Sequence, residues 1–517
     1  MRLRGFRSVL VAAFLEAFPV LLSLSVSPNT VHWESLFAPV FFVGFCLCLS
    51  SLFPSRRWRF LFVLALLVFY NLFEWSRFSS YFMQASSFNE RFFFHFNPET
   101  LYVACRVHVV SFLCAVLSLI LLPFLSWRLS EVPCAPAWLS PLFLAVCLLL
   151  RPAFFEFFQG IYRLSSQSLS CKELRGVAAD YSPPRLVGAA GKNILVVYLE
   201  SLELVYTLDE VFPGLTPNLN RLKREGLFFD NVVQVPGTGW TMAALVSTQC
   251  GTPLLDTQLI HPFGNSRRFE CFLSRARCVG DLLRDAGYRV VFLTGSYGEF
   301  SGMSAFLRAH GFEVLDYDAL SSRFSDGELW EWGIHDHGLF EEAYRVFERL
   351  AASGRPFALF VSTIDTHSPY GSPSPSCPAY KNSANSMLQA VHCTDHLLGR
   401  FLERIRAHPA YRDTVIAVLN DHLAMRNVAQ PLYPRGFKRR GMWIFLNTPF
   451  NGTVEGPVVP MDFAPTLLYL AGLKVEGDFP FGENALSPGH RLLDFFSPSL
   501  IAEIRAFNGC YLSLCSD

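Results

Sequence analysis

The stretch KNILVVYLESLE, Lys192–Glu203, decides the fold of most of the chain. Its continuous apolar run NILVVYL is typical of a strand that is buried on both faces of a parallel sheet. The segment TPNLNRLKREG follows, with Thr216 placed as N-cap, Pro217 as first helical residue and Gly226 as a stop, which predicts a helix. Strand-like and helical runs continue to alternate downstream, so an α/β domain with a mostly parallel central sheet is expected.

The later elements of this domain are predicted from the same two patterns. The strand candidates are Leu227–Val233, Arg289–Leu293, Ala358–Ser362, Val415–Leu419 and Met442–Leu446, and the clearest long helices are Gly338–Ala352 and Ser386–Ala407. Ligands of such sheets gather at the carboxyl ends of the strands. The residues that follow each strand are therefore the candidates for a functional site.

Polar side chains follow three of the predicted strands. Glu200 ends the first, His367 follows the strand Ala358–Ser362, and Asp421 and His422 follow Val415–Leu419. Taken singly, these are also compatible with a helix first-turn acid, turn residues and a loop histidine. Together, the carboxylates of Glu200 and Asp421 and the imidazole of His422 indicate a divalent metal site. Its mixed oxygen and nitrogen ligands suit manganese, zinc or magnesium.

The first third of the chain has a different composition. Of the 517 residues, 51% are hydrophobic and only 17% charged, against about 25% charged in an ordinary soluble protein. Apolar runs of near membrane-spanning length explain the difference: Ser8–Ser27, Trp33–Phe53, Trp58–Phe73, Leu101–Trp127 and Ala135–Phe155. They predict a five-helix transmembrane bundle, with residues 1–164 as anchor, 165–191 as linker and 192–517 as catalytic domain.

Loop charges predict which side of the membrane the domain occupies. Arginines precede the first span, lie between the second and third, and follow the fourth, whereas Pro28–His32 has no Lys or Arg. The positive-inside rule then places the N-terminus in the cytoplasm and everything after about residue 160 outside it. The segment Arg151–Leu164 fits an interfacial element. The net charge of zero argues against a nucleic-acid partner.

Cysteine usage agrees with an oxidising compartment. Eight of the 14 cysteines lie beyond residue 150: Cys171, Cys250, Cys271, Cys278, Cys377, Cys393, Cys510 and Cys515. Short spacing favours the disulfides Cys510–Cys515 and Cys377–Cys393, and Cys250 has either Cys271 or Cys278 as a partner. Zinc binding by cysteines is the alternative, but the sequence has no CxxC or paired CxxH spacing.

The stretch VPGTGWTMAALVSTQCG, Val235–Gly251, contains several potential nucleophiles at the start of an apolar helix. A threonine hydroxyl needs activation by a metal or a base before it can attack a phosphodiester. At the N-terminus of a helix, free backbone N–H groups would also favour an incoming anion. Thr241 and Thr238 both compete for this role, and either could instead be a simple cap.

These residues are part of a set of motifs that resembles the sulfatase-like branch of the alkaline phosphatase superfamily. The resemblance is greatest to membrane-anchored phosphoglycerol transferases and, more distantly, to lipoteichoic acid synthases, and it covers about Lys192 to Lys474. In chain order the motifs are LESLE, FPGLTPNLNRLKREG, GTGWTMAALVSTQCGTPL, DTHSPYG, NDHLAM and MDFAPTLLYLAGL. Of these, GTGWT together with NDHLAM is a specific combination.

The resemblance implies a role for individual residues. Thr241 is similar to the family's threonine nucleophile, which also touches the metal. Glu200, Asp421 and His422 resemble the metal ligands, with Mn²⁺ as the leading metal and Zn²⁺ or Mg²⁺ as options. His367 resembles a histidine that contacts the substrate phosphate. One departure is the loop GSYGEFSGM, Gly295–Met303, which lacks the Trp and Arg that grip glycerol phosphate in lipoteichoic acid synthases.

The implied activity is transfer of a phosphoglycerol head group from phosphatidylglycerol to an envelope glycan or lipid acceptor, with a phospho-threonine intermediate and release of diacylglycerol. Such an enzyme would reside in a bacterial inner membrane, with its catalytic domain in the periplasm. Phosphoethanolamine transfer to lipopolysaccharide or another envelope glycan is the alternative. A true sulfatase is disfavoured because no C/S-x-P-x-R motif surrounds Thr241. An inactive envelope sensor would be expected to lack the ligands.

Overall fold

A computed structural model describes residues 2–26, 33–84, 109–132, 136–150, 154–155, 157–158, 176, 181–188, 191–255, 276–298, 302–490 and 492–511. The chain forms two compact units, Met1–Gln167 and Ser168–Asp517. The division falls close to the predicted boundary between anchor and linker. The predicted interfacial element Arg151–Leu164 lies almost wholly outside the described residues.

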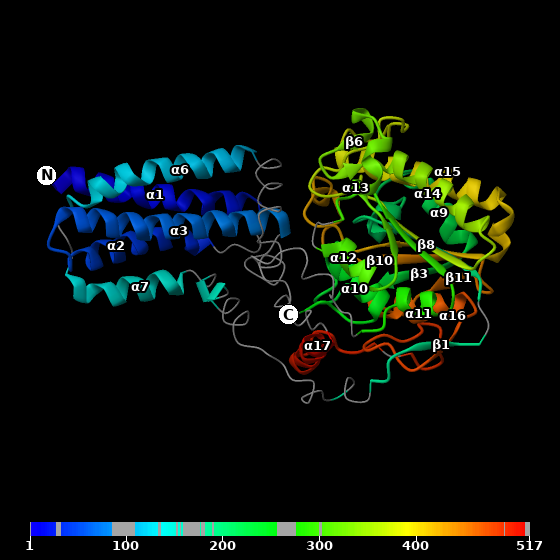
Figure 1. Ribbon diagram of the computed structural model, residues 1–517. Helices are drawn as coiled ribbons and strands as arrows, with labels where there is room; N and C mark the ends of the chain where they lie inside the picture. Colours follow the sequence, from blue (N-terminus) through cyan, green and yellow to red (C-terminus); the bar gives the residue numbers. More distant parts are fainter. Residues whose placement is uncertain are drawn as a thin grey trace. The chain divides into compact units, whose positions relative to one another are not determined.

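The first unit is helical (Figure 1). Its helices match the five apolar runs: α1 (Arg2–Val26), α2 (Ala38–Ser50), α3 (Arg56–Gln84), α6 (Val109–Leu129) and α7 (Ser140–Leu149). Helix α1 packs against α2, α3 and α6, and α2 packs against α7. Among the described residues, Arg56–Ser80 and Val110–Leu129 are long and apolar enough to cross a membrane, whereas the apolar stretches Ser8–Ser23, Ser35–Ser50 and Ala137–Leu149 are shorter. Five membrane crossings therefore remain a prediction.

An eight-stranded sheet forms the centre of the second unit. Its order is β11 (Gly452–Val454), β3 (Leu227–Val232), β10 (Gly441–Leu446), β9 (Thr414–Asn420), β2 (Asn193–Leu199), β8 (Phe357–Ser362), β4 (Arg289–Thr294) and β5 (Glu313–Leu315). Strand β10 runs antiparallel to β3 and β9, and the remaining neighbours are parallel. The sheet is therefore mixed, and the predicted parallel majority is confirmed.

Helices cover both faces of this sheet (Figure 1). Alternate residues of β2 point to opposite sides, so Leu195, Val197 and Leu199 join the core beneath α9 (Pro217–Glu225), α14 (Asp336–Ala351) and α15 (Ser386–Ala407). The opposite face packs under α10 (Thr241–Cys250), α11 (Val279–Asp285) and α16 (Phe463–Leu470). Both faces are thus buried, which explains the unbroken apolar run of β2.

The remaining elements lie around this three-layer core. Strand β1 (Arg185–Val187) pairs with β12 (Lys474–Glu476), and β6 (Leu329–Trp330) forms a short hairpin with β7 (Gly333–Ile334). The other helices are α12 (Met303–Ala309), α13 (Tyr317–Leu320) and α17 (Pro498–Tyr511). Helix α17 packs Ile504 and Phe507 into a small apolar cluster with Val235, close to the start of α10.

Helix α9 begins and ends where the sequence predicts, but Thr216 does not cap it with its side chain. The Thr216 hydroxyl donates to Tyr206 O. The carboxylate of Asp395, on α15, instead accepts hydrogen bonds from the backbone N–H groups of Asn218 and Leu219, at 3.0 and 2.7 Å. A side chain distant in the sequence therefore supplies the cap, which a local pattern cannot reveal.

Disulfides lie within the second unit, among the residues that the structure describes. The predicted Cys377–Cys393 bond is present. Cys250 is bonded to Cys278, which decides between the two partners considered for it. The predicted Cys510–Cys515 pairing and the cysteines Cys171 and Cys271 involve positions outside the described residues.

Candidate active site

The three predicted metal ligands come together at the carboxyl ends of two adjacent strands. Glu200 follows β2, and Asp421 and His422 follow β9. All three are buried, and one ligand atom of each lies within 4.8 Å of the others. His422 Nε2 is 3.7 Å from Glu200 Oε1 and 3.3 Å from Asp421 Oδ2. Parallel pairing of β2 with β9 brings together residues that are more than 200 positions apart.

Two atoms of this cluster are placed to bind a cation. His422 Nδ1 lies 2.9 Å from Leu423 O, and because a carbonyl oxygen only accepts, Nδ1 carries the hydrogen and Nε2 keeps its lone pair. Both His422 Nε2 and Asp421 Oδ2 are buried without a hydrogen-bond partner among the described residues. Burial, followed by the charge of Glu200, raises the pKa of Asp421 to about 7. A divalent cation would satisfy these atoms and offset the carboxylate repulsion.

Ser201 braces two of the ligands and was missed by the sequence reasoning. Its backbone N–H donates to Asp421 Oδ1 at 2.8 Å, and its hydroxyl donates to Glu200 Oε1 at 2.7 Å. To do both, Ser201 adopts a φ of 54°, a left-handed conformation that is strained for a residue with a side chain. Such strain persists where the surrounding contacts enforce it, and here they fix the two carboxylates.

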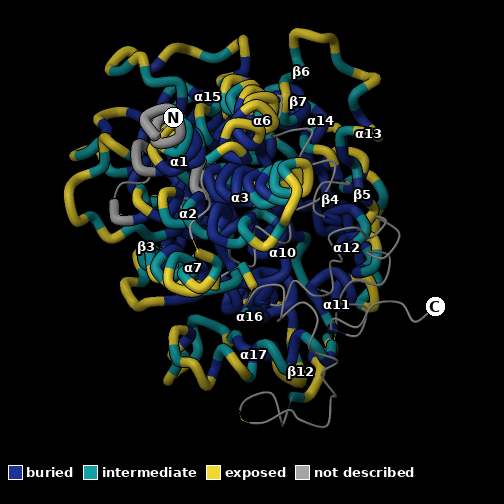
Figure 2. Tube along the Cα trace, turned by 90° about the vertical axis from the view of Figure 1, so that its left-hand side faces the viewer, coloured by how far each residue is buried: buried dark blue, intermediate teal, exposed yellow. Residues whose placement is uncertain are grey.

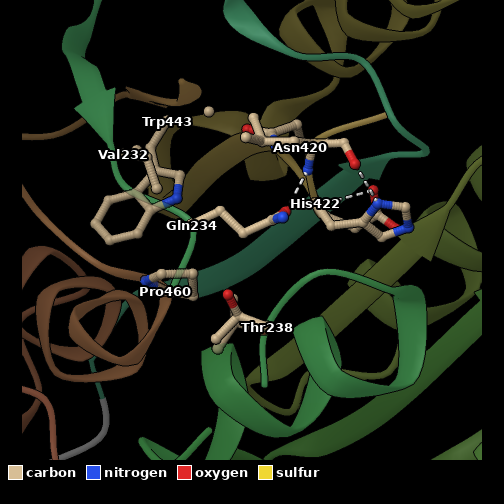
Figure 3. Close-up of a pocket in the computed structure, with 11 residues that line it drawn as sticks. Val232, Gln234, Thr238, Asn420, His422, Trp443 and Pro460 are labelled. Atoms are coloured by element: carbon tan, nitrogen blue, oxygen red, sulfur yellow. Dashed lines mark hydrogen bonds and ion pairs between the residues drawn. The ribbon is translucent and has the colours of Figure 1, made fainter. Parts of the chain in front are cut away.

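Further contacts hold the backbone on either side of the site. Thr363 Oγ1 accepts from Glu200 N at 2.9 Å, and the Thr366 hydroxyl donates to Glu200 O. From the loop after β3, Gln234 Oε1 accepts from Leu423 N at 2.8 Å. Figure 3 shows the Gln234 side chain extending toward the segment that carries His422, across a small pocket. The ligand-bearing segments after β2 and β9 are therefore tied to the ends of two further strands, β8 and β3.

Thr241 joins this cluster as the first residue of α10. Its Oγ1 donates to Glu200 Oε2 over 3.3 Å. The first backbone N–H groups of a helix have no partner within it, so they favour an anion at this end. Thr238, the other candidate, is fully buried and exchanges hydrogen bonds with Val235. The geometry therefore brings Thr241, and not Thr238, into hydrogen-bond contact with a predicted metal ligand.

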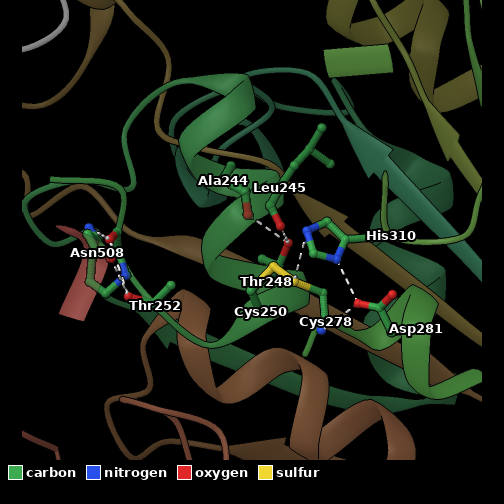
Figure 4. The surroundings of a disulfide bond; sticks show 10 residues. Ala244, Leu245, Thr248, Cys250, Thr252, Cys278, Asp281, His310 and Asn508 are labelled. Atoms are coloured by element: carbon green, nitrogen blue, oxygen red, sulfur yellow. Dashed lines mark hydrogen bonds and ion pairs between the residues drawn. A yellow bond between two sulfur atoms is a disulfide. The ribbon is translucent and has the colours of Figure 1, made fainter. Parts of the chain in front are cut away.

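The far end of α10 is held by covalent and polar contacts (Figure 4). Gly251 ends the helix with a φ of 68°, and the disulfide joins Cys250 to Cys278, the residue that caps α11. His310 lies beside this disulfide, 3.7 Å from Cys278 Sγ, and pairs with Asp281 at 2.6 Å. Because the two sulfurs are bonded to each other, they are not available as zinc ligands. The disulfide instead ties the end of α10 to the start of α11.

His367 lies beside the metal cluster on the loop after β8. The preceding residue, Thr366, contacts Glu200 O directly. His367 Nδ1 donates to Ser368 O at 2.8 Å, which leaves Nε2 as a hydrogen-bond acceptor. Burial lowers the pKa of His367 to about 4, so the ring is neutral at physiological pH. A neutral ring with a free lone pair is suited to accept a proton from a hydroxyl group.

Other polar residues near the strand ends serve the fold. Glu203 is buried and receives two hydrogen bonds from Arg439, so its carboxylate is neutralised by a paired cation. Asp365 accepts from His335 at 2.7 Å and from Ser374 at 2.6 Å. Because protein groups already pair with both carboxylates, neither Glu203 nor Asp365 needs a bound ligand to explain its burial. The sequence alone does not distinguish them from Glu200, because all three follow buried strands.

Comparisons with known proteins show which family the chain belongs to. The sequence pattern of the sulfatase family matches residues 192–473. Phosphoglycerol transferase I of Salmonella arizonae is 36% identical over 326 residues, which are 61% of this chain and 41% of that protein. Phosphoglycerol transferase I of Escherichia coli O127:H6 is 40% identical over 261 residues, 49% of this chain and 34% of that protein. The chain thus matches less than half the length of these relatives.

A solved structure shows a similar fold. A protein of the alkaline phosphatase superfamily from Vibrio parahaemolyticus superposes with a TM-score of 0.50 and 21% identity, over 64% of this chain and 79% of that one. The match to the family pattern spans more than half of the chain and contains every predicted site residue. The chain belongs to the sulfatase family and is similar to phosphoglycerol transferases.

Proposed function

We propose that the protein transfers the phosphoglycerol head group of phosphatidylglycerol to an envelope glycan or lipid acceptor and releases diacylglycerol. The single observation that carries this proposal is the contact of Thr241 Oγ1 with Glu200, at the N-terminus of α10 and beside Asp421 and His422. The similarity to phosphoglycerol transferases supports the head group.

In this proposal Glu200, Asp421, His422 and Thr241 hold a divalent cation, with Mn²⁺ as the leading metal and Zn²⁺ or Mg²⁺ as alternatives. When bound, the cation would stabilise negative charge on the threonine oxygen and on the phosphoryl group. The donor set fits, since it combines two buried carboxylates with a histidine whose Nε2 lone pair has no hydrogen-bond partner among the described residues.

The reaction proceeds in two displacements at phosphorus. Thr241 Oγ attacks the phosphodiester and gives up its hydroxyl proton, the bond from phosphorus to the diacylglycerol oxygen breaks, and that oxygen takes up a proton as diacylglycerol leaves. The acceptor hydroxyl then attacks the phospho-threonine ester and gives up its proton, the bond from phosphorus to Thr241 Oγ breaks, and Thr241 Oγ regains a proton. His367 Nε2 is the proposed acceptor of the proton from the attacking acceptor hydroxyl, because Nδ1 donates to Ser368 O and the ring is neutral, so Nε2 can accept a proton.

The proposal includes the placement of the protein in a bacterial inner membrane. Five crossings by α1, α2, α3, α6 and α7, with a cytoplasmic N-terminus, would put residues 192–517 in the periplasm. The disulfides Cys250–Cys278 and Cys377–Cys393 support an oxidising compartment. Reporter fusions after residue 167 test it, since a reporter active only in the periplasm should be active there, and cytoplasmic activity would contradict the five-span topology.

The donor is tested with the full chain in detergent, supplied with Mn²⁺ and either labelled phosphatidylglycerol or labelled phosphatidylethanolamine. Release of diacylglycerol from phosphatidylglycerol alone is the expected result. Release from phosphatidylethanolamine alone would replace the proposal with phosphoethanolamine transfer. A Thr241→Ser variant serves as a control, because it keeps a hydroxyl nucleophile at the same position, whereas Thr241→Ala removes it.

A further inference from the structure

A second group of potential metal ligands lies at the far end of α10, where Cys250, Cys278 and His310 meet (Figure 4). One ligand atom of each lies within 4.8 Å of the others, and all three side chains are buried. Cys250 is the last residue of α10 and Thr241 is the first, so the length of the helix, about 14 Å, separates this group from the candidate active site. The two groups of ligands are therefore distinct.

Three elements that are distant in the sequence build this group. Cys278 caps the start of α11, and His310 directly follows α12. A side chain on Gly280 would lie 2.3 Å from His310 O, so glycine at this position lets α11 approach the segment of His310 closely. As a result, His310 Nε2 lies 3.7 Å from Cys278 Sγ.

Asp281 orients the imidazole ring of His310. Its Oδ2 accepts from His310 Nδ1 at 2.6 Å and from Cys278 N at 3.1 Å. Because a carboxylate oxygen accepts, Nδ1 carries a hydrogen, and Nε2 is the ring nitrogen that faces the sulfur. Histidines that bind metals are held in this way, with the other ring N–H donated to a carboxylate or a carbonyl. The contact with Asp281 therefore places Nε2 as a ligand.

The two sulfurs become ligands in the thiol form of the chain. Every cysteine is a thiol when the chain is synthesised, and a disulfide forms later by oxidation. Rotation about the Cα–Cβ bonds lets two thiol sulfurs separate to about 3.8 Å, as tetrahedral zinc with Zn–S bonds of about 2.3 Å requires. The same geometry requires about 3.6 Å between sulfur and histidine nitrogen, close to the 3.7 Å between Cys278 Sγ and His310 Nε2.

The charge and the softness of these ligands favour Zn²⁺. Two thiolates balance the two positive charges of the ion, so a complex with a neutral imidazole places no net charge in the buried site. Thiolate sulfur also selects zinc over Mn²⁺ and Mg²⁺, which prefer oxygen ligands. The group thus differs in metal preference from the candidate active site, where two of the ligands are carboxylates.

We propose that Cys250, Cys278 and His310 form a zinc site in the thiol form of the chain, so that Zn²⁺ and the disulfide are alternative links between α10 and α11. On binding, each thiol loses its proton to solvent, both thiolates and His310 Nε2 bind the ion, and a water molecule takes the fourth position. No electron is transferred in this step. The ion fixes the end of α10 before the disulfide has formed.

Co²⁺ is the probe for this site, because thiolate ligands give it a charge-transfer absorption band that carboxylate and imidazole ligands do not. Metal-free full chain in detergent is reduced with a phosphine and titrated with Co²⁺. The reduced wild type should develop a band that the oxidised chain lacks, and Zn²⁺ should abolish it. Asp421→Asn should keep the band, since it alters the other group of ligands. Absence of the band from the reduced wild type would overturn the proposal.

Cysteine substitutions show which thiolates bind the ion. Cys278→Ser should abolish the band. The matched control is Cys377→Ser combined with Cys393→Ser, because within the described residues no histidine or carboxylate completes a metal-binding group with that pair. This control should keep the band. An undiminished band in Cys278→Ser, or loss of the band in the control alone, would refute the site.

His310→Gln separates the loss of a ligand from the loss of the fold. Both cysteines remain, so the oxidised variant keeps its disulfide, and a cooperative melting transition shows that it is folded. After reduction it should bind Co²⁺ at least about tenfold more weakly than the reduced wild type, and Asp281→Asn should bind about tenfold more weakly. Equal affinity in the wild type and His310→Gln would show that the histidine is not a ligand and would overturn the proposal.

Discussion

Protonation of Asp421 should compete with metal binding and make the metal affinity strongly pH-dependent. Burial and the charge of Glu200 raise the pKa of Asp421 from its ordinary 3.8 to about 7 in the metal-free protein. A cation binds the deprotonated carboxylate. The deprotonated fraction of a group with this pKa falls from about 0.9 at pH 8 to about 0.1 at pH 6, so Asp421 alone should weaken the apparent affinity about tenfold over that range.

The stability of the metal-free protein should change in the opposite direction. Because the folded-state pKa of Asp421 lies above the unfolded value, the native state binds this proton more tightly than the unfolded state does. The contribution of Asp421 to the free energy of unfolding is therefore fully present below pH 4 and is lost as the pH rises through 7. A bound metal ion offsets the free-energy cost of ionised, buried Asp421. The rise in melting temperature on adding metal should therefore be larger at pH 8 than at pH 6.

Calorimetric titration of chelator-treated full chain with Mn²⁺ at pH 6, 7 and 8 measures the effect, with Asp421→Asn as the matched variant. Asn has nearly the same shape but no proton to exchange, so Asp421→Asn should bind more weakly at pH 8 and show a flatter pH dependence. An affinity of the wild type that changes by less than about twofold between pH 6 and pH 8 would refute the reasoning.

Three further outcomes are expected. Ser201→Ala removes a hydroxyl that orients a metal-site carboxylate and should weaken Mn²⁺ binding about tenfold in calorimetry, with little change in melting temperature; unchanged affinity would contradict the bracing role. Replacing Cys250 and Cys278 with serine opens a 28-residue loop and should lower the free energy of unfolding in urea, measured without a reducing agent, by about 3–4 kcal/mol; an unchanged free energy of unfolding would contradict the bracing role. Arg439→Ala leaves Glu203 buried without its cation and should cost about 3–5 kcal/mol in the same assay, whereas a loss below about 1 kcal/mol would count against a buried ion pair.

Long, well-punctuated elements could be predicted from the sequence. The strand ending at Glu200 and the helix beginning at Pro217 were located correctly, because apolar runs and Pro/Gly signals are local. The edge strands β5 and β11 have three residues each, too few to show a period, and were missed. The antiparallel direction of β10 depends on tertiary connections that no local pattern records.

The candidate site, like the fold, was predictable only in part from the sequence. Strand-end logic and the family resemblance named Glu200 and the Asp421–His422 pair, which the fold brings together. The left-handed φ of Ser201 has no signal in the sequence, since serine rarely adopts it. The meeting of His310 with Cys278 depends on the close contact of Gly280 with a distant segment, which only the folded chain reveals.

The most direct test of the proposed mechanism is to trap its intermediate. Full-length protein is incubated with Mn²⁺ and phosphatidylglycerol without acceptor, then quenched in acid, digested and sequenced by mass spectrometry. One phosphoglycerol group on Thr241 is the predicted result, absent in Thr241→Ala and retained in Thr238→Ala. An adduct on another residue, or head-group transfer at wild-type rate by Thr241→Ala, would contradict the account.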